Sequence, residues 1–170
     1  MWLDPSRLLT LTRNIKNGFN EYIDNVTLNQ KIEENFEDLK EELDKLESKL
    51  SPLPKNADNK IIVVGDDMFK FLSKNKYGLT VYSLEENDNL NDKVIADVKN
   101  LINDGTIKYI YIKQYDEPNE TINNLIKGTN VEIIRINTLV NLTENEKNSK
   151  KDYFSIMNEN IELFKKNLYN

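Results

Sequence analysis

The chain has 170 residues, of which 38% are hydrophobic and 31% are charged, and this balance suits one globular domain with some additional helix. Its net charge of -6 argues against nucleic-acid binding, because phosphate contacts require clustered lysine and arginine. Histidine and cysteine are both absent, which excludes disulfides, thiolate chemistry and hydrolases built on a Ser–His or Cys–His pair.

Two long helices are predicted at the start of the chain. Asp4 is typical of an N-cap and Pro5 of a first helical position, so the first helix is expected over residues 5–23. The second is expected over residues 28–50, where apolar side chains recur in alternating steps of four and three. The opposite face of this second helix is rich in glutamate. We interpret it as a solvent-exposed face, with a short coiled-coil seam as the alternative.

The rest of the chain alternates between predicted strands and helices. After the proline-containing linker "SPLPKNADNK", strands are expected at 61–65, 79–84, 108–114 and 131–137. Helices are expected at 68–76, 91–105, 120–127 and 151–168. Such alternation is typical of parallel pairing with right-handed crossovers. The predicted fold class is therefore α/β, with two long N-terminal helices and then a four-stranded, mainly parallel sheet that carries helices on both faces.

This pattern divides the chain into a helical segment at residues 1–55, which includes the expected linking helix, and one α/β lobe at residues 56–170. Ligands of open α/β sheets bind beyond the carboxyl ends of the strands. Three short loops are therefore candidate sites, at residues 65–67, 85–86 and 113–117. None of them is a phosphate-binding loop, because the chain contains neither GxxxxGK[ST] nor GxGxxG.

Carboxylates in these loops have two interpretations. Asp66 and Asp67 follow a strand and precede a helix, so they are either a pair of oxygen ligands for a cation or a helix cap. Asp116 and Glu117 are either further ligands or part of a turn that leads into a proline-started helix. In both loops, position alone favours the structural interpretation over the ligand.

Four stretches, in order along the whole chain, resemble the C-terminal half of the zinc/manganese solute-binding proteins of metal-uptake ABC transporters, the metal receptors with a helical backbone. "WLDP" near the start is similar to the family's metal-site segment His-x-Trp-Leu-Asp-Pro, and "LDKLESKLSPLP" resembles the end of the helix that links two lobes. "VVGDDMFKFLSKNKYGLTV" is similar to a strand, a His-Asp-Ala-Phe motif and a Tyr-Gly-Leu run. "LVNLTENEKNSKKDYFSIMNENIELFKKNL" resembles the family's closing segment, where an Asp-Tyr pair begins a helix that contains Met and Asn.

The resemblance implies a metal site from which this chain departs. The family's first histidine would stand one residue before Met1, so the chain is expected to begin just past that ligand, or to lack the N-terminal lobe naturally. A second ligand histidine falls on Gly65, and a carboxylate ligand falls on Lys113 or the residue after it; neither Gly65 nor Lys113 is a ligand. A lysine would have to lose its proton before it could bind a cation.

Only oxygen donors remain near these positions. Asp66, Asp67 and Glu117 are the candidate metal ligands, with Asp116 beside them. Such a set suits hard cations such as Mn²⁺, Mg²⁺ or Ca²⁺ better than zinc. The residues themselves predict no cofactor; zinc or manganese is the divalent cation that the resemblance implies, and we expect weak or no zinc binding by this chain.

The resemblance implies the extracytoplasmic metal-binding component of an ABC uptake transporter, here a single lobe without its usual ligands, and not an enzyme. Its expected partners are an ABC permease and the missing N-terminal lobe, and no nucleic acid. The expected location is outside the cytoplasmic membrane, as part of a longer membrane-anchored lipoprotein whose signal segment lies outside this chain. No apolar run in the sequence is long enough to cross a membrane as a helix.

Two other functions compete with that interpretation. The first is a ligandless surface interaction module or adhesin derived from the same family, which would expose a contiguous apolar or aromatic patch. A half-protein would instead expose an apolar face near Trp2, Leu3 and the first helix, where the missing lobe once packed. The second is an enzyme that uses paired carboxylates, but no spacing in the sequence selects a general acid and a general base.

Overall fold

The structure is a computed structural model that describes residues 2–73 and 76–169. The chain forms two compact units, Met1–Ser51 and Pro52–Asn170. Among the described residues, no helix combines the length and the apolar character required to span a membrane. The assignment of residues 1–55 as a linking segment and 56–170 as a lobe stays a prediction.

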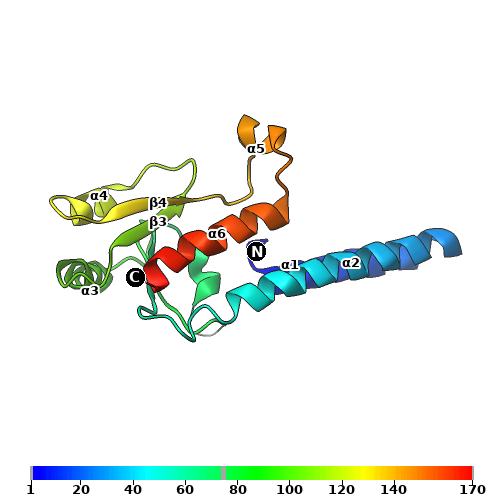
Figure 1. The fold of residues 1–170 in the computed structure, drawn as a ribbon, viewed down its shortest axis with the longest axis horizontal. Helices are drawn as coiled ribbons and strands as arrows, with labels where there is room; N and C mark the ends of the chain where they lie inside the picture. The colour runs from blue at the N-terminus through cyan, green and yellow to red at the C-terminus, as the bar shows by residue number, and fades with distance from the viewer. Residues whose placement is uncertain (1, 74–75, 170) are drawn as a thin grey trace. The chain divides into compact units, whose positions relative to one another are not determined.

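The first unit is a pair of helices, α1 (Pro5–Tyr22) and α2 (Val26–Leu50), which run side by side (Figure 1). The carboxylate of Asp4 caps α1 by accepting hydrogen bonds from the backbone N–H groups of Ser6 and Arg7. Asn25 caps α2 in the same way, through the N–H of Leu28. Because Asn25 provides this cap, α2 begins two residues earlier than its apolar periodicity predicted.

The second unit is built on the expected four-stranded sheet. Its strands are β1 (Ile61–Val64), β2 (Thr80–Ser83), β3 (Tyr109–Lys113) and β4 (Glu132–Ile136). They lie in the order β2-β1-β3-β4 and every pair is parallel, which confirms the predicted fold class. The chain leaves β1 toward β2 on one side and returns to β3 on the other, so the strand order reverses between β1 and β3.

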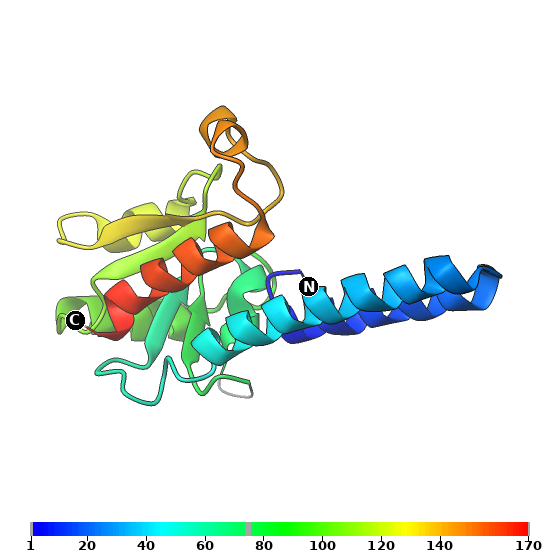
Figure 2. The same ribbon diagram turned by 45° about the vertical axis from the view of Figure 1, so that its right-hand side comes forward.

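Helices cover both faces of this sheet (Figure 2). One face packs against α3 (Asp92–Asn103) and α4 (Glu120–Ile126), in a core that includes Val63, Ile110 and Ile112. Alternate residues of β3 point to the other face, where the buried Tyr111 ring lies 5.2 Å from the ring of Phe164 on α6 (Tyr153–Leu168). This double coverage explains why the strands read as continuous apolar runs.

Two local elements differ from expectation. The helix expected over 68–76 is a 3₁₀ helix, η1 (Asp67–Leu72), and residues 74–75 of that expectation lie outside the described residues. Side chains three residues apart align along a 3₁₀ helix, which lets both Phe69 and Leu72 be buried. A five-residue helix, α5 (Glu144–Asn148), was not predicted. It has no apolar face, and a capping box between Thr143 and Glu146 sets its start.

Candidate functional site

A small cavity of about 250 Å³ lies where β1, β2 and β3 end. Its walls include Gly65 and Asp66 after β1, Glu85 after β2, and Lys113 and Asp116 at the end of β3. This is the edge where the strand order reverses, the usual place for a ligand in an open parallel sheet. The structure therefore brings together the three loops that the sequence singled out.

Lys113 is the cation at the centre of this edge. Its ammonium nitrogen lies 2.6 Å from Oδ2 of Asp66 and 3.0 Å from Oδ2 of Asp116. Hydrogen bonds to Asp66 and Asp116 raise the pKa of Lys113 above its ordinary value, so the ammonium stays charged at neutral pH. The other oxygen of Asp66 accepts a hydrogen bond at 2.8 Å from the N–H of Met68 and caps η1.

Asp67 points to different partners. Its carboxylate lies 2.7 Å from the ammonium of Lys70, one turn along η1, and its backbone N–H donates to Glu85 at 2.7 Å. Burial acts to raise the pKa of Asp67, but hydrogen bonds from Lys70 and Ser83 outweigh that effect and leave the pKa lowered. Asp66 and Asp67 are thus neighbours in sequence that pair with different lysines.

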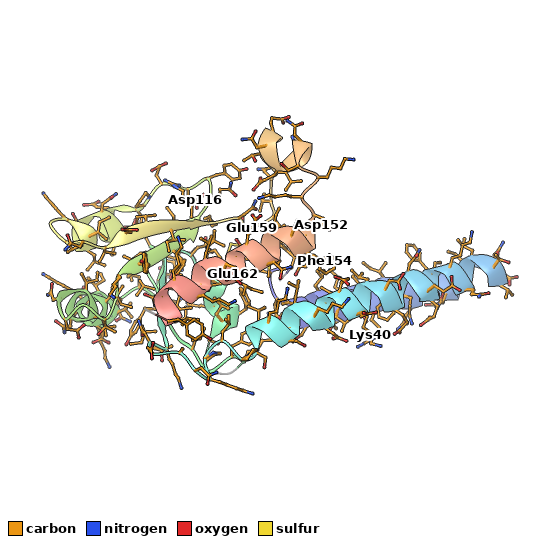
Figure 3. The ribbon with its side chains drawn as sticks, viewed as in Figure 1. Lys40, Asp116, Asp152, Phe154, Glu159 and Glu162 are labelled. Carbon is orange, nitrogen blue, oxygen red and sulfur yellow. The ribbon has the colours of Figure 1, made fainter. Side chains whose placement is uncertain are left out.

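Glu117 is also paired with a cation. Its carboxylate lies 3.2 Å from the guanidinium of Arg135, at the end of β4, and Arg135 also donates to the backbone carbonyls of Gln114 and Asp116. Figure 3 shows Asp116 in the loop that follows β3. Arg135 therefore holds this loop through three of its residues, which the sequence did not predict. The only sequence signal was that Arg135 is one of three arginines in the chain.

The arrangement of these carboxylates does not fit a zinc site. Asp66, Asp67 and Glu117 each have a different cationic partner, and Lys113 places a positive charge between Asp66 and Asp116. Within residues 2–73 and 76–169, no group of three or more histidine, cysteine, aspartate or glutamate side chains is arranged to hold a metal ion. The predicted role of Asp66, Asp67 and Glu117 as ligands stays a prediction.

The position that resembles a ligand histidine has little room for a side chain. A Cβ atom on Gly65 would lie 3.0 Å from Cγ2 of Ile112 and 3.1 Å from Cδ1 of Ile122. Both neighbours are well-packed core residues, 3% and 1% exposed. A larger residue at position 65 would have to displace them.

Comparison with known proteins identifies the family. The model of the ZnuA family, the periplasmic component A of zinc-uptake complexes, matches residues 1–167. The chain belongs to this family. This match confirms the resemblance drawn from the sequence. ZnuA-family proteins are metal-binding solute receptors and not enzymes.

Curated ZnuA-family relatives are much longer than this chain. It is 26% identical over 168 residues to the zinc-binding protein AdcA of Streptococcus pyogenes serotype M3, a match that covers 97% of this chain and 32% of AdcA. The AdcA protein of serotype M18 is 25% identical over the same length. The chain thus spans about one third of these relatives.

Solved structures share the ZnuA fold. The Zn(II)-bound ZnuA-like domain of Streptococcus pneumoniae AdcA matches with a TM-score of 0.74 and 21% identity, over 99% of this chain and 63% of that one. The metal-dependent lipoprotein YcdH of Bacillus subtilis matches with a TM-score of 0.76, 21% identity and the same two coverages. The laminin-binding protein Lbp of Streptococcus pyogenes matches at 0.72 and 15% identity, over 98% of this chain and 63% of Lbp.

Proposed function

We propose that this chain provides the linking helices and the C-terminal lobe of an extracytoplasmic metal receptor that delivers zinc or manganese to an ABC permease. Its family membership and its likeness over 99% of the chain to a Zn(II)-bound ZnuA-like domain support this proposal. In this proposal the metal is cargo, and the receptor is the N-terminal lobe together with this chain. The longer protein is a membrane-anchored lipoprotein.

The observation that carries the proposal is an exposed apolar face on the first unit. Ten large hydrophobic side chains are exposed in the described residues, and seven of them lie between residues 2 and 28: Trp2, Leu11, Ile15, Phe19, Tyr22, Val26 and Leu28. Ile15 and Phe19 are each about half exposed although they belong to one stripe of α1. Leu3, by contrast, is buried. Clustering of this kind marks a surface that another protein part covers.

The same face contains a groove between the two helices. The groove has a volume of about 270 Å³ and is lined mainly by Ile15, Phe19, Ile32, Phe36 and Leu39. Lys16 also lines the groove. Its ammonium lies 4.5 Å from the centre of the Phe36 ring and 2.8 Å from a carboxylate oxygen of Glu33. An apolar groove on a pair of charged helices supports the half-protein interpretation, in which the N-terminal lobe packs against α1 and α2.

The size and location of the native protein test this proposal. Antibodies raised against this chain would be used on membrane and soluble fractions of the source cells. The proposal predicts a membrane-bound band well above 19.9 kDa, the mass of this chain. A band of that mass in the soluble fraction would contradict it.

A second candidate is the surface adhesin. It is supported by the shared fold with Lbp, whose name records laminin binding. An adhesin would expose a contiguous apolar or aromatic patch. The exposed large hydrophobic residues described on the α/β unit, Tyr115, Val140 and Tyr169, are scattered along the chain, so such a patch would have to lie on the helices. Saturable binding of the purified chain to immobilised laminin would favour this candidate over the receptor.

A further inference from the structure

We propose that Lys113 is a built-in cation, which takes the place of a divalent metal at the carboxyl edge of the sheet and excludes metals from this lobe. The inference rests on the proposed function and deepens it. It assigns metal capture to ligands outside this lobe, while the lobe keeps its shape without a metal. It follows from a comparison of two observations: the chain belongs to a metal-binding family, but the residues at this edge include Gly65 and a lysine bound to two carboxylates.

The contacts of Lys113 are those expected of a bound cation. Its ammonium joins Asp66, which follows β1, to Asp116, which follows β3, with N–O distances of 2.6 and 3.0 Å. The two carboxylates come from loops that follow neighbouring strands, so without a cation between them they would repel each other. The side chains of Lys113 and Asp66 are only 32% and 19% exposed, which limits solvent screening of the pair.

A divalent cation cannot share this place with the ammonium. Like charges a few ångströms apart repel strongly, and the ammonium of Lys113 already lies within 3.0 Å of a carboxylate oxygen of both Asp66 and Asp116. The other acidic groups of the cavity are already bonded. Glu85 accepts the N–H of Asp67, and Glu86 accepts both the N–H and the hydroxyl of Thr121. A metal would have to break several of these contacts.

The surrounding packing also prevents a donor at the neighbouring position. A Cβ on Gly65 would approach Ile112 and Ile122 at 3.0 and 3.1 Å, so a ligand side chain there would disturb the core. Glycine at position 65 and lysine at position 113 thus act together. Gly65 provides no ligand side chain and leaves little space for one, and Lys113 supplies a positive charge between the two carboxylates.

Removal of the ammonium provides the test. Thermal unfolding and calorimetry would be run with Mn²⁺ on the full chain and on Lys113→Met, with Lys113→Arg to preserve the charge. Lys147→Met is the matched control, because Lys147 makes an exposed ion pair with Glu144 away from this cavity. The double variant Lys113→Met with Asp66→Asn keeps an oxygen that can cap η1 and removes the carboxylate.

The inference predicts that Mn²⁺ leaves the melting temperatures of the wild type, Lys113→Arg and Lys147→Met unchanged. Lys113→Met melts at a lower temperature, and Mn²⁺ restores it. Its affinity for Mn²⁺ exceeds that of the wild type at least about tenfold, which corresponds to about 1.4 kcal/mol. Asp66→Asn in the double variant removes this gain.

Two results would overturn the inference. One is stoichiometric binding of Mn²⁺ or zinc by the wild type with a rise in its melting temperature. The other is a Lys113→Met variant that folds and gains no affinity for Mn²⁺. Neither result depends on the size or location of the native protein, so failure of this inference and failure of the proposed function are separate outcomes.

Discussion

Asn137 and Asn160 are joined by two reciprocal hydrogen bonds that connect the end of β4 to the middle of α6. The side-chain amide of Asn160 donates to the backbone carbonyl of Asn137 at 2.8 Å, and its side-chain oxygen accepts the N–H of Asn137 at 3.2 Å. Both residues are buried, 8% and 3% exposed. One asparagine side chain therefore satisfies both the N–H and the carbonyl of the residue that directly follows β4.

Replacement of Asn160 by alanine should be costly. Asn160→Ala would leave a donor and an acceptor of the Asn137 backbone buried without partners, with an expected loss of about 2 kcal/mol or more. Urea unfolding followed by circular dichroism measures this loss. Asn158→Ala is the control on the same helix, because Asn158 donates to the Phe154 carbonyl within α6 and its loss should cost less. Equal losses would show that the link to β4 contributes little.

The hydroxyl of Tyr111 provides a second link to α6. It donates to the carbonyl of Leu163 at 3.0 Å, and burial raises the pKa of Tyr111 well above its usual range. Tyr111→Phe keeps the ring packing and removes this bond, so the free energy of unfolding should fall by about 1 kcal/mol. Tyr109→Phe, at the half-buried start of the same strand, should change stability less in the same denaturant titration. An unchanged Tyr111→Phe midpoint would contradict this prediction.

Glu146 should make stability depend on pH in the acid range. Burial acts to raise its pKa, but hydrogen bonds from Thr143 and then from Asn137 outweigh burial and lower the pKa below the ordinary value of 4.5. A carboxylate with a lowered pKa in the folded state adds stability above its unfolded pKa. That stability is lost as the pH falls through the folded pKa.

Glu146→Gln is the variant that tests this pH dependence. The stability gap between it and the wild type should be largest near neutral pH and should shrink as the pH falls below about 4.5. Urea midpoints measured across that range would show it. Glu144→Gln, on the same helix and in an exposed ion pair with Lys147, should give a smaller gap near neutral pH. A gap for Glu146→Gln that widens in acid would reverse the predicted sign.

The apolar face of α1 should control how the isolated chain behaves in solution. Without another protein part on this face, the purified chain should self-associate as its concentration rises, because Ile15 and Phe19 are each about half exposed. The double variant Ile15→Glu with Phe19→Glu should remain monomeric and keep its helical content. Light scattering after gel filtration measures the oligomeric state of both chains, and circular dichroism measures the helical content of the double variant. A wild-type chain that is monomeric at high concentration would argue against a surface that needs covering.

Periodicity was enough to predict the architecture. The apolar run at β1 and the alternation of strands with helices predicted a parallel sheet, and its two covered faces follow from residues such as Ile110 and Tyr111, which point to opposite sides. The short α5 was missed because its stability comes from the Thr143–Glu146 capping box and not from an apolar stripe. Local capping of this kind gives a weaker pattern than burial.

The sequence predicted where the candidate site lies but not which ion pairs its side chains form. Position after a strand was sufficient to place Asp66, Asp116 and Glu117 at one edge of the sheet. It was not sufficient to show that Lys113 would lie between two of them or that Arg135 would hold the third. Lys113 is 47 positions from Asp66, and Arg135 is 18 positions from Glu117. Lys113 and Asp116 are paired across a turn. Such pairs depend on the order of the strands and on the length of the side chains.

Calorimetric titration of zinc into the purified chain tests most directly the claim that metal capture needs ligands outside it. The proposed function and the role of Lys113 together predict no stoichiometric zinc binding, because Asp66, Asp67 and Glu117 already have cationic partners. A tight zinc site with one ion per chain would contradict that claim. It would show that the residues of this chain are sufficient to capture the metal.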